Sequence, residues 1–397
     1  MLGTDTLKAI REDMERLSLP SWFPPAPSHP GEVKWGKFKA AEWKSFCTVN
    51  LPITLTRLWG SLPMTDRRYL MLQNFLQLVA AIKLANGRTI TIDQIDQYER
   101  HMRKYLTGLV ELYPWISITP YQHMALHFPS HLRRFGPTHS WRCFAFERYN
   151  GLIQNIPTNS RFGEMEITKF NRFIQAQNLR AIFSKCQVPS EVQPILEAFE
   201  KRHQTDIYST FMHDGPLVSY SEPDVEGWQN QNLTALPKEH RALLHNWLRK
   251  ADSTTNPSIV TRVFAQKKVD RAGQTFECGQ GNNSHVVFRP HLNGELSAGV
   301  ILSIFSHAER QRSATGGITR TFVILQEYGR LSIDDQRLDV FRLLPTVTGF
   351  LCDHEPQGPL VLLPFSDVIG HFAGTIMSIP GIERVCMHVL PLSSSDY

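Results

Sequence analysis

Apolar side chains recur every three or four positions through the first 210 residues, which is the spacing of amphipathic helices. Thr91 and Gln94 form a capping box before the clearest of these segments, and Gly87 ends the segment before it. A further helical pair is expected on either side of a break near Pro52. The pattern predicts helices over approximately 6–17, 66–86, 91–113, 121–128, 144–156 and 163–183.

After residue 285 the apolar positions alternate instead, as in half-buried strands. Turn residues (Gly, Pro, Asp and Ser) separate five such runs. These runs are LSAGVILSIFSHA, RTFVILQEYG, VFRLLPTVTGFLCDH, LVLLPFSDVIGHFAG and ERVCMHVLPL. Five short strands in succession predict a small β-barrel.

The two patterns divide the chain into four segments and predict an α+β multidomain protein. Residues 1–34 form a helix and a connector, LPSWFPPAPSHPG, whose five prolines exclude a helix or a central strand. Residues 35–210 form a mainly α-helical domain. Residues 211–285 are rich in Asn, Gln, Ser, Thr, Gly and Asp, and predict a partly disordered linker with one short helix, KEHRALLHNWLRK. Residues 286–397 form the barrel-like domain.

Composition places the chain among ordinary globular proteins, with 42% hydrophobic and 20% charged residues. No apolar run approaches the roughly 18–20 residues that cross a bilayer, so no membrane contact is expected. The N-terminal sequence MLGTDTLKAIREDMERL has no apolar stretch of a secretory signal. The six cysteines form no CxxC pair, which favours reduced thiols in the cytosol or nucleus.

Positive charge concentrates in residues 121–185, which contain nine basic and three acidic residues, whereas the whole chain has a net charge of only +5. Such a local excess fits a polyanionic partner. The alternative is a solvated charged surface whose arginines pair with nearby acids. The basic residues are Arg133, Arg134, Arg142, Arg148, Arg161, Lys169, Arg172, Arg180 and Lys185.

Two features of this stretch could carry chemistry. His123 and His127 are four positions apart, so on one helix they would project from the same face and could chelate Zn²⁺. The same spacing also arises by chance among 16 histidines. Glu147 lies among aromatic residues, where an unpaired carboxylate is costly to bury. Either an ion pair with Arg142 or Arg148, or a functional role, would explain it.

The ordered motifs HMALHF, FGPTHSW and FERYNG resemble the conserved C-terminal region of CACTA-type (En/Spm) DNA transposases. In that region an HLxxHL-like helical segment is followed by GPxHxxxxxxxER. LPSWFPPAPSHPG and WKSFCTVNLPITLTRLWG resemble the part just upstream in the fungal branch. LSAGVILSIFSH and FSDVIGHFAGTIMSIPGIERVCMHVLPL resemble its C-terminal β region. With gaps, the resemblance covers most of the chain.

The resemblance implies a relative of the RAG-type recombinases, with an RNase H-like core and an Asp-Asp-Glu triad. Three such carboxylates hold two Mg²⁺ or Mn²⁺ ions, which activate the nucleophile and stabilise the leaving oxygen. A helical insertion before the Glu carries histidine ligands for a structural zinc. On this pattern Glu147 corresponds to the triad Glu, and His123 and His127 to the zinc-binding pair.

The chain also departs from the family pattern. Both triad Asp residues should precede the insertion, and the charged helical segment that holds Asp5 and Asp13 is not assigned that role. No CxxC accompanies the histidine pair. Cys47 is therefore the candidate third zinc ligand, and a buried structural thiol is the other interpretation. Pro129 interrupts the histidine helix where relatives tend to continue it.

The resulting hypothesis is the C-terminal fragment of a cut-and-paste transposase, nuclear and catalytically incomplete by itself. Its expected partners are DNA, an RNase H-like core supplied in trans and a second copy of the chain. The DNA-binding candidates are Arg133, Arg134, Arg142, Arg148, Arg161, Lys169 and Arg172. One alternative is a domesticated, non-catalytic DNA- or chromatin-binding protein, and another is a globular protein whose similarity is accidental.

The order of the C-terminal strands resembles the SH3-like barrels of chromatin-associated BAH modules. Such barrels bind peptides or nucleic acid, although a fold does not fix a function. The alternative is a domain for packing or dimerisation.

Overall fold

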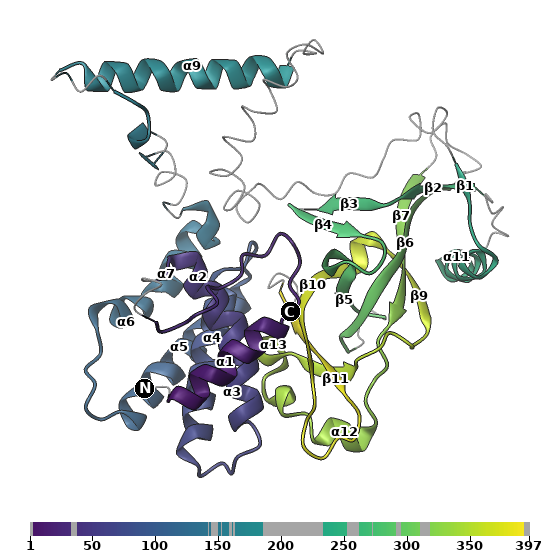
Figure 1. Ribbon diagram of the computed structural model, residues 1–397, viewed down its shortest axis with the longest axis horizontal. Coiled ribbons are helices and arrows are strands. Elements are labelled where there is room, and N and C mark those ends of the chain that lie inside the picture. Colours follow the sequence, from purple (N-terminus) through teal and green to yellow (C-terminus); the bar gives the residue numbers. More distant parts are fainter. Residues whose placement is uncertain are drawn as a thin grey trace. The chain divides into compact units, whose positions relative to one another are not determined.

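A computed structural model gives the fold of the chain, which is a mixed α+β architecture (Figure 1). The chain divides into two compact units, Met1–Pro137 with Pro216–Tyr397, and Thr138–Gly215. The structure describes residues 3–32, 38–141, 143, 150–151, 153–158, 161, 163–185, 233–251, 262–271, 273–290, 295–309 and 318–392.

The N-terminal part of the first unit is helical, as the apolar spacing predicts. Its elements are α1 (Thr4–Arg16), α2 (Ala40–Ser45), the π-helical turn η2 (Phe46–Asn50), α3 (Leu51–Trp59), α4 (Arg67–Ala85), α5 (Ile92–Leu112), α6 (Pro120–Ala125) and α7 (Phe128–Phe135). None of the described helices is long and apolar enough to cross a membrane.

Local capping sets the ends of the two longest of these helices. The side chain of Asp66 accepts a hydrogen bond from the backbone N–H of Arg68 at the start of α4. Thr91 and Gln94 form the predicted capping box at the start of α5. These three bonds satisfy backbone donors that the start of a helix leaves free. The predicted bounds of these helices are confirmed to within one or two residues.

The break expected near Pro52 is wrong. Residues 40–59 run as α2, η2 and α3 without interruption. Pro52 lies in the first turn of α3, directly after the π-helical turn, and has no N–H to donate to the preceding turn. The π-helical turn before it absorbs the irregularity. Phe46, Leu51 and Leu55 thereby join Leu72 and Leu76 of α4 in one buried cluster.

The rest of the first unit is built on antiparallel strands. They are β1 (Thr234–Ala235), β2 (Arg262–Gln266), β3 (Lys268–Arg271), β4 (Gln274–Glu277), β5 (His285–Phe288), β6 (Ser297–Glu309), β7 (Ile318–Glu327), β8 (Phe350–Asp353), β9 (Leu360–Pro364), β10 (Val368–Met377) and β11 (Cys386–Pro391). The short elements η5 (Asn282–Ser284), α12 (Ile333–Arg337), η6 (Val340–Leu343), α13 (Pro345–Thr348) and η7 (Phe365–Asp367) connect some of them.

Nine strands form one sheet in the order β1-β2-β6-β5-β10-β11-β8, and β7 pairs with both β6 and β9. β3 and β4 form a separate hairpin. β6 and β7 are the longest pair, and a register shift between Ile301 and Ser303 bends β6. The strand ladders of the described residues form no closed barrel. An antiparallel C-terminal sheet is thus confirmed, and the barrel stays a prediction.

Two parts of the strand prediction differ from the structure. The run VFRLLPTVTGFLCDH is a strand only at Phe350–Asp353, because η6 and α13 occupy residues 340–348. The segment 211–285 contains the predicted short helix, α11 (Lys238–Ala251), and also β1 to β4. Apolar side chains of α11, including Leu244 and Leu248, pack against Phe305 and Phe322 of the sheet.

The segment after α1 attaches the N-terminus to the sheet. Ser18 exchanges two backbone hydrogen bonds with Gly374 of β10, at 2.8 and 3.0 Å. The indole N–H of Trp22 donates to Nδ1 of His371 at 3.1 Å. The backbone N–H of Ser21 donates to the side chain of Asn283. The proline-rich connector forms neither a helix nor a central strand, as predicted, but it is not extended throughout, because it turns at residues 20–23 and 28–31. Ser18, just before it, pairs with β10.

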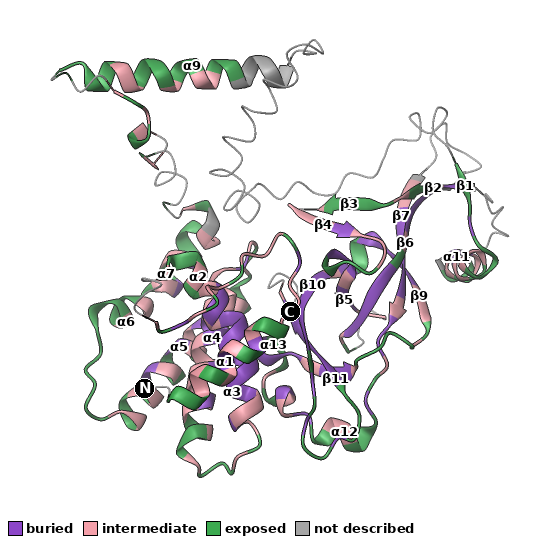
Figure 2. Ribbon diagram, viewed as in Figure 1, coloured by how far each residue is buried: buried purple, intermediate pink, exposed green. Residues whose placement is uncertain are grey.

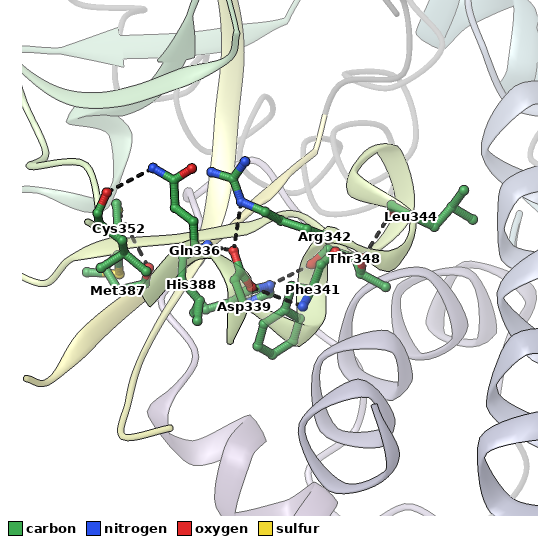
Figure 3. Close-up of polar contacts among 11 residues, drawn as sticks. Gln336, Asp339, Phe341, Arg342, Leu344, Thr348, Cys352, Met387 and His388 are labelled. Carbon is green, nitrogen blue, oxygen red and sulfur yellow. Dashed lines mark hydrogen bonds and ion pairs between the residues drawn. The ribbon is translucent and has the colours of Figure 1, made fainter. Parts of the chain in front are cut away.

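A buried carboxylate joins η6 to β8 (Figure 3). The side chain of Asp339 is fully buried and accepts backbone hydrogen bonds from Phe341 and Leu351, both at 3.0 Å. Arg342 lies 3.4 Å away as an ion partner. Burial raises the pKa of the Asp339 carboxyl, although the backbone hydrogen bonds and Arg342 oppose that effect.

The second unit contains α9 (Met165–Lys185), which matches the helix predicted over 163–183. Its apolar side chains are largely exposed, among them Ile167 and Phe170 (Figure 2). The helix predicted over 144–156 falls mostly outside the described residues, although residues 150–151 and 153–154 are helical.

Candidate nucleic-acid interface

The two predicted zinc ligands are brought together. Nε2 of His123 and Nε2 of His127 are 3.2 Å apart, and their rings meet edge to face. They do not share one helix, because α6 ends at Ala125 and His127 is the N-terminal cap of α7. Pro129 explains the interruption, since it has no N–H to donate to the carbonyl of Ala125. The predicted proximity is therefore confirmed, and the predicted single helix is wrong.

This geometry suits chelation. Two imidazole nitrogens bound tetrahedrally to Zn²⁺ at 2.0–2.1 Å lie about 3.3 Å apart. The observed separation of 3.2 Å is close to that value, and both side chains are exposed. Without a metal, the same two neutral rings can share one hydrogen bond, with one ring as donor. The separation is therefore compatible with two ligands of one ion.

Cys47 is not brought to the histidine pair. It lies in η2 and packs against the helical core around Phe46. Burial raises the pKa of its thiol to about 11, whereas a metal-bound cysteine is a thiolate. In the part of the chain that the structure describes, no three His, Cys, Asp or Glu side chains are grouped to hold a metal ion. A tetrahedral zinc would need two further ligands.

Glu147, the candidate triad residue, lies outside the described residues, as do Arg142 and Arg148. Asp13, which received no role from the sequence, has a structural one. Its buried carboxylate accepts two hydrogen bonds from Arg57, at 2.9 and 3.1 Å. This ion pair joins α1 to α3.

Arg133 and Arg134 differ although they are adjacent on α7. Arg133 donates to Asp96 at 2.6 Å and lies 3.8 Å from Glu99, both on α5. Its charge is therefore largely offset, as the alternative interpretation of the basic stretch expected. Arg134 is exposed and lies over the ring of Phe135 at 5.4 Å. No ion pair of Arg134 occurs among the described residues.

In the second unit, Arg161 lies 3.9 Å from Glu164, and both side chains are exposed. Lys169 is half-buried and Arg172 exposed on α9. An exposed ion pair such as that of Arg161 is weak in water. Arg161 can therefore release Glu164 and bind a phosphate instead.

One cation of the first unit was not predicted from the sequence. Arg67, at the start of α4, lies over the rings of Tyr113 and Trp115 at 5.7 and 5.6 Å. Its Nη2 also donates to the carbonyl of Leu112 at 2.7 Å. The aromatic stretch directly after α5 marks one half of this contact in the sequence, but it does not identify Arg67 as the partner.

Comparison with known proteins adds no assignment: no protein-family model, no curated protein and no solved structure matches this chain. Its class therefore rests on its own residues. These are a histidine pair set to chelate, exposed bases on α7 and α9, and an aromatic surface beside a cation.

The histidine pair gives a direct prediction. Protein purified without a histidine tag is expected to contain zinc, measured by elemental analysis, and the double variant His123→Ala with His127→Ala is expected to lose it. Because binding and folding are coupled at a structural zinc, the double variant should also lower the melting temperature. His131→Ala, on the next helix, is the matched control and should retain the metal. Zinc that is absent from the wild type, or stays stoichiometric in the double variant, contradicts the site.

Proposed function

We propose that this chain is the C-terminal portion of a CACTA-type DNA transposase that acts in the nucleus and binds DNA through bases carried on α7 and α9. The observation that carries the proposal is the positive charge of residues 121–185, a segment with nine basic residues and only three acidic ones. Arg134 and Arg172 are exposed. Exposed bases neutralise phosphates and release counterions, which favours binding to any DNA sequence.

In this proposal the chain does not catalyse strand transfer by itself. Glu147 is its only assigned triad carboxylate, and one carboxylate cannot hold the two Mg²⁺ or Mn²⁺ ions of such a site. The remaining carboxylates would come from an RNase H-like core supplied in trans. The sequence motifs around Glu147 support this assignment.

We further propose that the C-terminal sheet closes into a small SH3- or BAH-like barrel. An isolated antiparallel bridge between Arg330 and Cys352 supports closure. Arg330 follows the end of β7, and Cys352 lies in β8, which is the last strand in the order of the sheet. The bridge therefore connects the terminal strand β8 to the segment that follows β7. The N–H of Asp353 also donates to the carbonyl of Gly329 at 2.8 Å.

The DNA-binding proposal is tested by fluorescence anisotropy of the full chain with a duplex oligonucleotide at several salt concentrations. If about five bases contact phosphate, log K should fall against log salt with a slope of roughly −4 to −5. The triple variant Arg134→Ala, Lys169→Ala and Arg172→Ala should weaken binding for all sequences. Its slope should become shallower by about one for each phosphate that is no longer neutralised.

Two controls sharpen this experiment. Arg133→Ala should change the slope less than Arg134→Ala, because Asp96 and Glu99 already offset the charge of Arg133. Arg337→Ala, at an exposed pair with Asp334 in the sheet region, should leave binding unchanged. Failure of the full chain to bind at low salt, or equal binding by the triple variant, would show that these bases form only a solvated surface.

A further inference from the structure

Large apolar side chains are exposed along the connection from α5 to α6 and on α6 itself (Figure 2). Trp115 is 72% exposed and Tyr121 is 88% exposed. A continuous exposed apolar surface on a folded domain usually marks an interaction site. We call this set, together with the half-buried Tyr113, the aromatic patch, and its exposed members are Trp115, Ile116, Ile118, Tyr121 and Met124.

The patch has a defined local structure. Pro114 follows the end of α5, and the N–H of Ile116 closes a turn by donating to the carbonyl of Tyr113 at 2.9 Å. The ring of Trp115 meets the ring of Tyr113 edge to face, with centroids 5.8 Å apart. The guanidinium of Arg67 lies over both rings and is held by the carbonyl of Leu112. The two rings and the cation are thus fixed by α4 and α5.

The electrostatics of the patch favour an anionic partner. Residues 112–146 contain no Asp or Glu. The carboxylates next to Tyr113 and Arg67 along the chain are Glu111, at the end of α5, and Asp66, which is already paired with Arg68 at 2.9 Å. Arg67 makes no ion pair within the described part of the chain. A polyanion can therefore approach the rings without meeting a carboxylate on this stretch.

A partner that is both anionic and aromatic fits better than a lipid surface. Single-stranded DNA presents phosphates together with base faces, and proteins bind it by pairing cations with exposed rings on which bases stack. An anionic lipid headgroup can pair with the guanidinium of Arg67, which lies over the rings of Tyr113 and Trp115, but a headgroup has no flat aromatic face to stack on those rings.

We propose that the aromatic patch stacks on unpaired bases, so that the chain binds single-stranded DNA more tightly than duplex DNA of the same length. This inference rests on the proposed DNA-binding function and adds the form of DNA. Trp115 and Tyr121 supply the stacking rings, and Arg67 supplies a cation over the ring of Trp115.

The test measures affinity of the full chain by anisotropy for a single-stranded oligonucleotide and for its duplex. Trp115→Ala and Tyr121→Ala should each weaken single-strand binding by about fivefold to a hundredfold, the usual range for loss of one stacked base. Duplex binding should be unchanged, because phosphate contacts remain. Trp43→Ala removes another exposed tryptophan, 51% exposed on α2, and should change neither affinity.

The outcomes separate the two proposals. If duplex and single strand bind equally, or if the patch variants bind single strands as the wild type does, the stacking role is overturned while DNA binding stands. If neither form of DNA binds, both proposals fail. Sedimentation with vesicles of phosphatidylcholine and phosphatidylserine that depends on Trp115, with no preference for single strands, would assign the patch to membranes and overturn the inference.

Discussion

Lowering the pH from 6.5 to about 4 is expected to reduce the free energy of unfolding by about 3 kcal/mol for each of two buried histidines, His371 and His388. Burial is the main cause that lowers the pKa of each ring to about 4. Both side chains are fully buried. The folded state therefore resists protonation in a range where the unfolded chain accepts it.

The hydrogen bonds of the two rings explain why the folded state disfavours a second proton on either imidazole. Nε2 of His371 pairs with the carbonyl of Asn283 at 3.1 Å, so it carries the proton, and Nδ1 accepts from Trp22. Nε2 of His388 pairs with the carbonyl of Thr348 at 2.6 Å (Figure 3). The cation of Lys83 also lowers the pKa of His388. Protonating either Nδ1 would bury a charge.

The direction of the effect follows from the pKa values. A histidine whose pKa is lower in the folded state contributes stability above its unfolded pKa of 6.5, and that contribution is lost as the pH falls toward the folded value of about 4. His285 and His307, whose pKa values burial also lowers, act in the same direction. The raised pKa of Asp339 acts oppositely, since its folded state gains a proton more readily.

Urea unfolding at a series of pH values measures this loss. His371→Gln and His388→Gln should each be less stable at neutral pH, but each should show a smaller fall between pH 6.5 and 4 than the wild type. His354→Gln, at an exposed site, should keep the full fall. A wild-type stability that stays level over this range would contradict the expectation.

Gly349→Ala is expected to lower the free energy of unfolding by about 4 kcal/mol, which combines a conformational cost with an overpacking cost. Gly349 ends α13 at φ 80° and ψ −149°, a region that is essentially restricted to glycine. An added Cβ would lie 2.9 Å from the carbonyl carbon of Val389 and still closer to its oxygen. These contact atoms belong to the backbone of β11, so they cannot move away by a change of side-chain rotamer.

Gly136→Ala is the matched control for this variant. Gly136 ends α7 at φ 75° and ψ −157°, almost the same conformation, but its Cβ would meet no atom of the described residues within 4 Å. It should cost only the conformational part, about 1–2 kcal/mol. Chemical unfolding of both variants isolates the contact with β11 as their difference. Equal losses for the two variants would show that the contact is relieved by a shift of β11.

Elements governed by local chemistry were the ones that the sequence could predict. α4 and α5 begin where Asp66 and Thr91 cap them, because a cap is made within three residues. Residues 340–348 were wrongly predicted as strand because their apolar residues alternate. What decides that segment is the buried carboxylate of Asp339, which caps η6 and also bonds Leu351, 12 positions along the chain.

In the candidate site, too, contacts between nearby residues could be predicted and contacts between distant residues could not. The four-residue spacing of His123 and His127 predicted their proximity, which survives the break of the helix. The pairing of Arg133 with Asp96 joins residues 37 positions apart, and the spacing of charges along the chain carries no information about such a contact. The pairing of Arg67 with Tyr113 and Trp115 escaped prediction for the same reason, since it depends on how α4 and α5 pack.

The attachment of the N-terminal segment to β10 has a consequence for synthesis on the ribosome. Trp22 and His371 are 349 positions apart, so the whole intervening segment must be translated before their bond can form. Contacts between such distant positions close late and slow folding. α1 and the connector are therefore synthesised before β10, and they have no strand to pair with until β10 has been made. A protein that is cut short before residue 371 would leave Trp22 without its partner, and we expect quality-control proteases to recognise that exposed segment.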